Sequence, residues 1–302
     1  MIRYALITCL LLSPLANADG WQDGNKAFDN GDYTTALRHW LPLAKGGMAE
    51  AQFNMALCYS NGWGTGVDHQ KARFWLKQAA QQGLAAAQHN LALSYAAGQG
   101  GAQNLVGAAH WYKQAVQQNL PAAQHNLAMM LLEGKGVSKN ASEAIQWLQK
   151  AAEQNYALSQ FTLGTLYLDG QAVDKNPLLA QKWTLQAAEQ GLPAAQHNLA
   201  TLYLNQSDEK QAAFWYTAAS QQGYPESQAV LGRLYQVGKG VERDLLQAYF
   251  WTALARQETP PGEKLSALQQ RLDQLQAILR PHELDQAKEL VRSWSLAQES
   301  KP

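Results

Sequence analysis

The apolar positions of the chain follow a helical pattern that returns about every 36 residues. In residues 84–96 they fall at i, i+4, i+5 and i+8, on one face of an α-helix: Ala87, Leu91, Ala92 and Tyr95. A glycine follows at position 98, and a second apolar stretch around Trp111 comes after a short loop. Because a glycine just past a helix commonly ends it, the pattern predicts two helices joined by a turn.

Three kinds of residue mark this repeat independently. A tryptophan recurs in steps of 36, 36, 36, 32 and 36 residues, at Trp75, Trp111, Trp147, Trp183, Trp215 and Trp251. The same period separates a row of Asp and Asn residues (Asp68, Asn104, Asn140, Asn176, Asp208 and Asp244) and a row of glutamines (Gln52, Gln88, Gln124, Gln160, Gln196 and Gln228). A period of about 20 to 50 residues indicates a solenoid. We therefore expect an all-α fold of helix-turn-helix repeats.

Each predicted hairpin also carries local signals for its helices. The Asp and Asn row stands where an N-cap is expected, because these side chains accept the free N–H groups of a first helical turn. A row of alanines permits close helix packing: Ala72, Ala108, Ala144, Ala180, Ala212 and Ala248. The period ends after residue 256, where Leu residues at helical spacing predict further helices. We expect about seven hairpins over residues 19–256 and C-terminal capping helices over residues 257–302.

The first eighteen residues have the features of a cleavable signal peptide. Arg3 is followed by an apolar run and by the small-residue motif Ala16-Asn17-Ala18. We expect cleavage after Ala18 and a mature chain that is periplasmic or secreted. A lipoprotein signal ending at Cys9 is the less favoured alternative, because too little apolar sequence precedes it.

Composition argues against several classes of function. Lys+Arg and Asp+Glu number 24 each, and no basic cluster is available for phosphate groups, so we expect no nucleic-acid partner. The apolar run of the leader is too short to span a bilayer, and we expect no membrane span. Gly-x-Ser-x-Gly, His-Glu-x-x-His and phosphate-loop sequences are absent, so we expect neither an enzyme nor a cofactor site. Cys58 lies in an apolar helical stretch, as a small buried residue would.

One repeat carries a recognisable run of residues, Ala87-Gln88-His89-Asn90-Leu91-Ala92-Leu93-Ser94-Tyr95, followed by a Gly-rich loop, Ala-x-x-Trp and Ala-Ala-x-Gln-Gly. Together these motifs resemble the Sel-one-like repeat family, a relative of the tetratricopeptide repeats, over about residues 24–256. The resemblance implies a right-handed αα-superhelix whose first helices line a concave side, and a role as an adaptor between proteins. The chain is similar to exported bacterial members that serve in envelope assemblies. It lacks the paired cysteines of the branch that acts on β-lactams.

The family geometry places two rows of side chains on the concave side: Phe53, His89, His125, Phe161 and His197 in one, and Asn54, Asn90, Asn126 and Asn198 in the other. We expect them to form a groove for an extended or helical peptide, whose backbone the Asn amides would bind. The alternative is that these Asn residues pack against the backbone of the next repeat and are a structural feature of the family. No metal site is expected, because the histidines lie in separate repeats and stacked helices are ~8–10 Å apart.

The sequence thus favours an exported, monomeric scaffold that binds an unidentified protein or peptide in this groove. Two alternatives stay open. One is a hydrolase or ligand-binding protein that acts on peptidoglycan or β-lactams, and the other is a secreted factor that engages a host protein.

Overall fold

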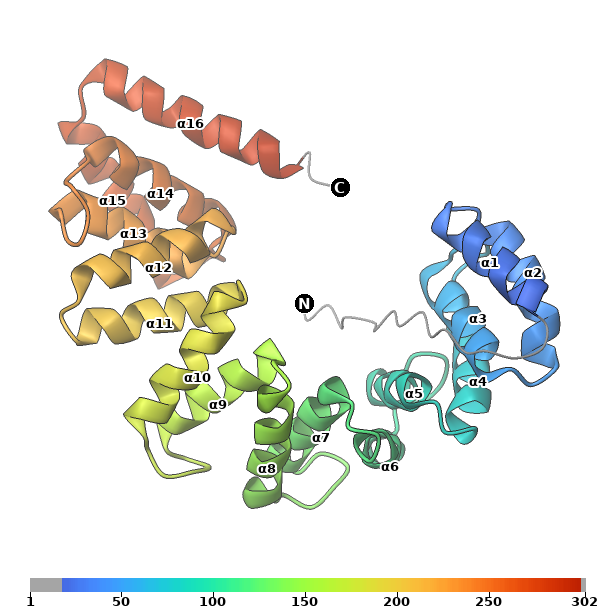
Figure 1. Ribbon diagram of the computed structural model, residues 1–302. Helices are drawn as coiled ribbons and strands as arrows, with labels where there is room; N and C mark the ends of the chain where they lie inside the picture. Colours follow the sequence, from blue (N-terminus) through green and yellow to red (C-terminus); the bar gives the residue numbers. More distant parts are fainter. Residues whose placement is uncertain (1–17, 300–302) are drawn as a thin grey trace. The chain divides into compact units, whose positions relative to one another are not determined.

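The structure is a computed structural model that describes residues 18–299, and Figure 1 traces its helices in order. Sixteen α-helices and no strands are found in this part of the chain, and the expected all-α helical-repeat fold is confirmed. Except for Ala18, the predicted signal peptide lies outside the described residues, and so do residues 300–302.

Fourteen of the helices form seven consecutive hairpins. The first helices of the hairpins, called A helices below, are α1 (Ala18–Asp29), α3 (Ala49–Asn61), α5 (Ala85–Ala97), α7 (Pro121–Glu133), α9 (Ala157–Asp169), α11 (Pro193–Asn205) and α13 (Pro225–Val237). The second helices, called B helices, are α2 (Tyr33–Lys45), α4 (His69–Gln81), α6 (Leu105–Val116), α8 (Ala141–Glu153), α10 (Pro177–Glu189), α12 (Glu209–Gln221) and α14 (Leu245–Glu258). Two further helices follow, α15 (Glu263–Ile278) and α16 (Pro281–Glu299).

The chain divides into two compact units, residues 1–159 and residues 160–302. The first unit holds α1 to α8 and the first residues of α9. The second holds the rest of α9 and α10 to α16.

Local side-chain and backbone contacts begin and end the helices where the sequence predicts. Oδ1 of Asp68 accepts the backbone N–H groups of Gln70 and Lys71 at 3.1 and 3.0 Å, which caps α4. The same kind of cap begins the other B helices, at Asp32, Asn104, Asn140, Asn176, Asp208 and Asp244. Each cap contributes ~1 kcal/mol. Gly98, with φ 71°, ends α5 in the left-handed conformation.

A second glycine in four of the five long loops, at positions 64, 100, 136 and 240, lets consecutive hairpins touch through their backbones, whereas the loop between α9 and α10 holds Ala172 there. Gly100 has φ +75°, and a Cβ atom there would overlap the carbonyl of His69 at the start of α4. Gly136 meets the carbonyl of Leu105 in the same way. A side chain at either position would therefore push a loop away from the hairpin before it.

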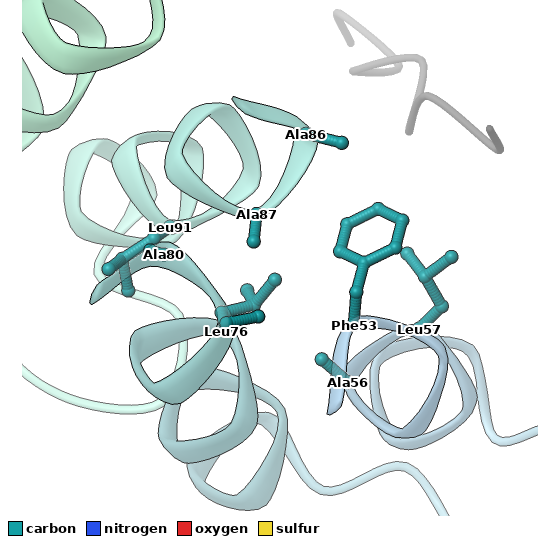
Figure 2. Close-up of a cluster of buried hydrophobic side chains, with 9 residues drawn as sticks. Phe53, Ala56, Leu57, Leu76, Ala80, Ala86, Ala87 and Leu91 are labelled. Carbon is teal, nitrogen blue, oxygen red and sulfur yellow. The ribbon is translucent and has the colours of Figure 1, made fainter. Parts of the chain in front are cut away.

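Successive hairpins also share their apolar core. In the first unit, Figure 2 shows Phe53 and Leu57 of α3, Leu76 of α4 and Ala87 of α5 in one buried cluster. Ala72 of α4 is 3% exposed, and such small side chains let the helices approach closely. Each large apolar side chain buried in this way contributes ~1.5–3 kcal/mol, so most of the stability comes from contacts between neighbouring helices.

In the second unit, α15 and α16 pack against α14. Leu268, Leu272 and Leu275 of α15 are buried. The ring of Trp294 in α16 lies 6.0 Å from that of Phe250 and 5.7 Å from that of Trp251. These two helices therefore cover apolar side chains at the end of the last hairpin.

The glutamine row links successive hairpins, a role that its spacing alone did not reveal. Nε2 of Gln88 donates to the carbonyl of Ala80 in the preceding hairpin at 3.2 Å, and Oε1 of Gln88 accepts from Nε2 of Gln118 at 2.9 Å. The second of these bonds recurs as Gln82 to Gln52, Gln154 to Gln124, Gln190 to Gln160 and Gln222 to Gln196. In the last hairpin the donor position holds Glu258, and Oε1 of Gln228 has no partner.

Candidate binding site on the A helices

The nine predicted site residues all lie on A helices, but their exposure differs along the chain. Four in the first unit are buried, none of them more than 7% exposed: Phe53, Asn54, His89 and Asn90. The other five are half-buried: His125 and Asn126 in the first unit, and Phe161, His197 and Asn198 in the second. At α3 and α5 the side chains therefore face the interior, and they do not form the open groove wall expected of them there.

The His and Phe row contacts the following hairpin through matched side chains. Nδ1 of His125 lies 3.0 Å from Oγ of Ser159, and Nδ1 of His197 lies 2.9 Å from Oγ of Ser227. In two repeats the row holds phenylalanine instead of histidine. There the position that corresponds to Ser159 and Ser227 on the next A helix, called the facing position, holds alanine. The two side chains share an apolar cluster: Phe53 with Ala87, and Phe161 with Ala195. Polar thus meets polar, and apolar meets apolar, between these neighbouring hairpins.

His89 is the exception, because Ala123 stands at its facing position. Its Nε2 is instead 3.0 Å from Nδ2 of Asn126 on α7, and its Nδ1 is 3.2 Å from Oδ1 of Asn90. Asn126 therefore bonds to a side chain of the preceding repeat, whereas the alternative interpretation of the Asn row expects contact with the backbone of the next repeat.

Burial keeps the histidines of this row uncharged. It lowers the pKa of His89 and of His125 to about 4. Burial also lowers the pKa of His197, against a smaller opposite effect of Glu226. Each ring packs against a tyrosine ring as well, with centroids 5.4–5.7 Å apart: Tyr112, Tyr156 and Tyr216. Near pH 7 these histidines are neutral hydrogen-bonding groups, His89 buried and the other two half-buried.

The Ser–His pairs resemble parts of a hydrolase site only in composition. Ser159 and Ser227 are both 0% exposed, so a substrate has no path to either hydroxyl. Cys58 is equally buried, and burial raises the pKa of its thiol to about 12, which keeps it protonated. Within residues 18–299, no three His, Cys, Asp or Glu side chains gather as metal ligands. None of the helices in that range has both the length and the apolar character that a bilayer crossing needs.

A cavity of about 310 Å³ lies between α3, α4 and α5 in the first unit. Leu57, Leu76 and Leu93 form apolar walls. Asn90 also lines it, and its Nδ2 has no hydrogen-bond partner although the side chain is only 2% exposed. An unpaired buried donor costs ~1–3 kcal/mol, so this amide would gain from a ligand that supplies an acceptor.

The sequence profile of the Sel1 repeat matches six consecutive segments, residues 49–84, 85–120, 121–156, 157–192, 193–224 and 225–258. The chain belongs to the Sel1 repeat family. Each matched segment contains one A helix and its B helix, from the hairpin of α3 and α4 to that of α13 and α14. Sel1 repeats are generally non-catalytic scaffolds for contacts between proteins.

One solved structure agrees with this assignment. A Sel1 repeat protein from Oxalobacter formigenes is 31% identical, covering 81% of this chain and 100% of its own, with a TM-score of 0.70. A protective antigen present in uropathogenic Escherichia coli strains, with an SLR fold, is 24% identical, covering 94% of this chain and 79% of its own, with a TM-score of 0.43. None of the curated proteins compared with this Sel1 repeat chain matches it.

Proposed function

We propose that this Sel1 repeat chain is an exported scaffold that binds a protein or peptide through its A helices, within an assembly of the cell envelope. The cavity between α3, α4 and α5 carries the proposal, because the unpaired amide of Asn90 lines it. A peptide backbone offers a carbonyl acceptor at every residue, which suits such a donor.

Other A-helix side chains would extend the contact. In the first unit these are His125 and Asn126 on α7, and in the second Phe161 on α9 with His197 and Asn198 on α11, all of them half-buried. With a formal net charge of zero, binding by packing and hydrogen bonds is favoured over long-range charge steering. The scaffold would act as a monomer and needs no cofactor.

We place the mature chain in the periplasm or outside the cell, on the signal-peptide features of residues 1–18. N-terminal sequencing of the exported chain should then begin at Asp19. Comparison of periplasmic and culture-medium fractions separates an envelope scaffold from a secreted factor that engages a host. The hydrolase alternative receives no support from the Ser–His pairs, because both serines are fully buried.

Site-specific photo-crosslinking in the cells that produce the protein tests the proposal. The photoreactive residue would replace Gln99, which lines the cavity, or Val106, which is 70% exposed and lies outside its lining. We expect one protein to crosslink to position 99 and not to position 106. If no protein crosslinks, or if both positions capture the same mixture, the proposed function fails.

A further inference from the structure

We propose that the cavity between α3, α4 and α5 is a pocket for one uncharged aliphatic side chain of a bound segment, of leucine or methionine size. A backbone carbonyl of the same segment accepts a hydrogen bond from Nδ2 of Asn90. The inference rests on the proposed function, because it specifies which part of a protein partner enters the A-helix site.

The size and walls of the cavity suit one side chain with its peptide group. Its 310 Å³ is about ten times the ~30 Å³ that one water occupies in the liquid, and lies at the lower end of the range for ligand pockets, ~300–1,000 Å³. Leu57, Leu76 and Leu93 supply the apolar surface, with Ala72 and Ala97 beside them. Figure 2 shows Leu57 and Leu76 in the same cluster, one from α3 and the other from α4.

The cavity selects against charged groups. None of its lining residues is Asp, Glu, Lys or Arg. A carboxylate or ammonium group would therefore lose its water without gaining a counter-charge from a lining residue. The polar atoms of Ser94 are already committed, since its Oγ donates to the carbonyl of Gln99 and accepts from Nε of Arg73.

A chain of hydrogen bonds sets the direction of the Asn90 amide. Nδ2 of Asn126 can only donate to Nε2 of His89, at 3.0 Å. With Nε2 as the acceptor, the proton of the neutral ring sits on Nδ1, which donates to Oδ1 of Asn90 at 3.2 Å. This leaves the buried Nδ2 group of Asn90, a residue that lines the cavity, as an unpaired donor. The ligand must therefore supply an acceptor, and a peptide carbonyl is one.

Leu76 lines the cavity, so the size of the residue at position 76 limits the space there. Two other hairpins carry tyrosine at the equivalent position, Tyr112 and Tyr216, and both are buried. The hydroxyl of Tyr216 lies 2.8 Å from Oγ1 of Thr201, which is the equivalent of Leu57 on α3. A tyrosine at position 76 would thus reach across to Leu57, whereas the shorter Leu76 leaves the space open.

Binding of a small probe to the full-length purified chain tests the inference. The probe is N-acetyl-leucine N-methylamide, titrated into protein labelled with ¹⁵N in its asparagines, and the Asn90 side-chain resonance is assigned by its loss in Asn90→Val. We expect that resonance to shift saturably. Leu76→Tyr should weaken binding by roughly tenfold or more, because it fills the space for a side chain worth ~1.5–3 kcal/mol. Asn54→Val is the matched control, because Nδ2 of Asn54 is also unpaired but Asn54 does not line the cavity.

Asn90→Val, which introduces the residue found at the equivalent position 230, is the second variant should Leu76→Tyr fail to fold. In uniformly ¹⁵N-labelled protein it should weaken the binding seen at the backbone resonances of α5, because Asn90 is the only asparagine of that helix. No shift with the leucine probe, or an equal shift with N-acetyl-glutamate N-methylamide or N-acetylglucosamine, overturns the inference. Crosslinking from position 99 that persists unchanged in Leu76→Tyr overturns it while the proposed function stands. If the leucine probe binds but no protein crosslinks to position 99 in cells, the pocket is supported and the proposed function is wrong.

Discussion

Acid should loosen the contact between α7 and α9 through His125. This imidazole sits against Oγ of Ser159, and burial lowers its pKa from 6.5 to about 4. In the unfolded chain the ring binds a proton near pH 6.5, whereas in the folded chain it stays neutral down to about pH 4. The unfolded state therefore takes up the proton first, and stability falls as the pH decreases from 6.5 to 4 and levels off below that window.

The size of the effect follows from the shift. One pKa unit corresponds to ~1.4 kcal/mol, so a decrease from 6.5 to about 4 amounts to at most ~3 kcal/mol for His125. His89 has the same shift and adds a similar amount in the same window. Both lie in the first unit, so two histidines make that unit acid-sensitive, while burial also lowers the pKa of His197 in the second unit.

The repeat itself supplies the variant that tests this reasoning. The double substitution His125→Phe with Ser159→Ala reproduces the pair that Phe161 forms with Ala195. We expect nearly unchanged stability at pH 7.5. At pH 4.5 the variant should be more stable than the parent by up to ~3 kcal/mol, because the proton uptake of the unfolded ring is gone.

Urea unfolding followed by circular dichroism, at half-unit steps from pH 7.5 to 4, measures the difference. Each single variant completes a double-mutant cycle, and His125→Phe alone should be the least stable because it leaves Oγ of Ser159 buried without its imidazole partner. An identical slope of unfolding free energy against pH in the parent and the double variant would refute the argument that His125 is buried neutral.

Other contacts between hairpins give further predictions. Glu258→Gln should raise the unfolding free energy by ~0.5–1.5 kcal/mol in urea melts, because it supplies the N–H that Oε1 of Gln228 lacks; no change would show that this oxygen is already satisfied. Gln88→Ala should lower the melting temperature by removing two bonds between helices, and a matched loss is expected for Gln196→Ala, which makes the equivalent pair. Gly136→Ala should lower it as well, because a Cβ would overlap the carbonyl of Leu105 at a residue with φ +71°, while Gly191→Ala, also at positive φ but in open space, carries the strain without the overlap.

The sequence predicts part of the site and leaves the rest undecided. All nine expected residues do lie on A helices, because the period fixes their place in each hairpin. The amino-acid type at these positions does not determine how buried the side chain is or which hydrogen bonds it makes. Asn90 and Asn126 are equivalent asparagines, yet Nδ2 of Asn126 meets His89 while Nδ2 of Asn90 has no partner. Leu76 lines the cavity where two other hairpins carry tyrosine, but Leu148 stands at the same position of another hairpin, so the residue type alone does not predict the cavity.

The sequence by itself determined the repeat, the helix ends and the family. Those signals act within a few residues of one another, as when Asp68 caps the turn that follows it or Gly98 ends α5. Only the tertiary structure decided which A-helix side chains are buried, which histidine finds a serine and where an amide remains unpaired. These outcomes depend on partners supplied by a neighbouring hairpin, 34 residues away for His125 and Ser159 and 37 for His89 and Asn126, and packing brings such pairs together while local preference does not.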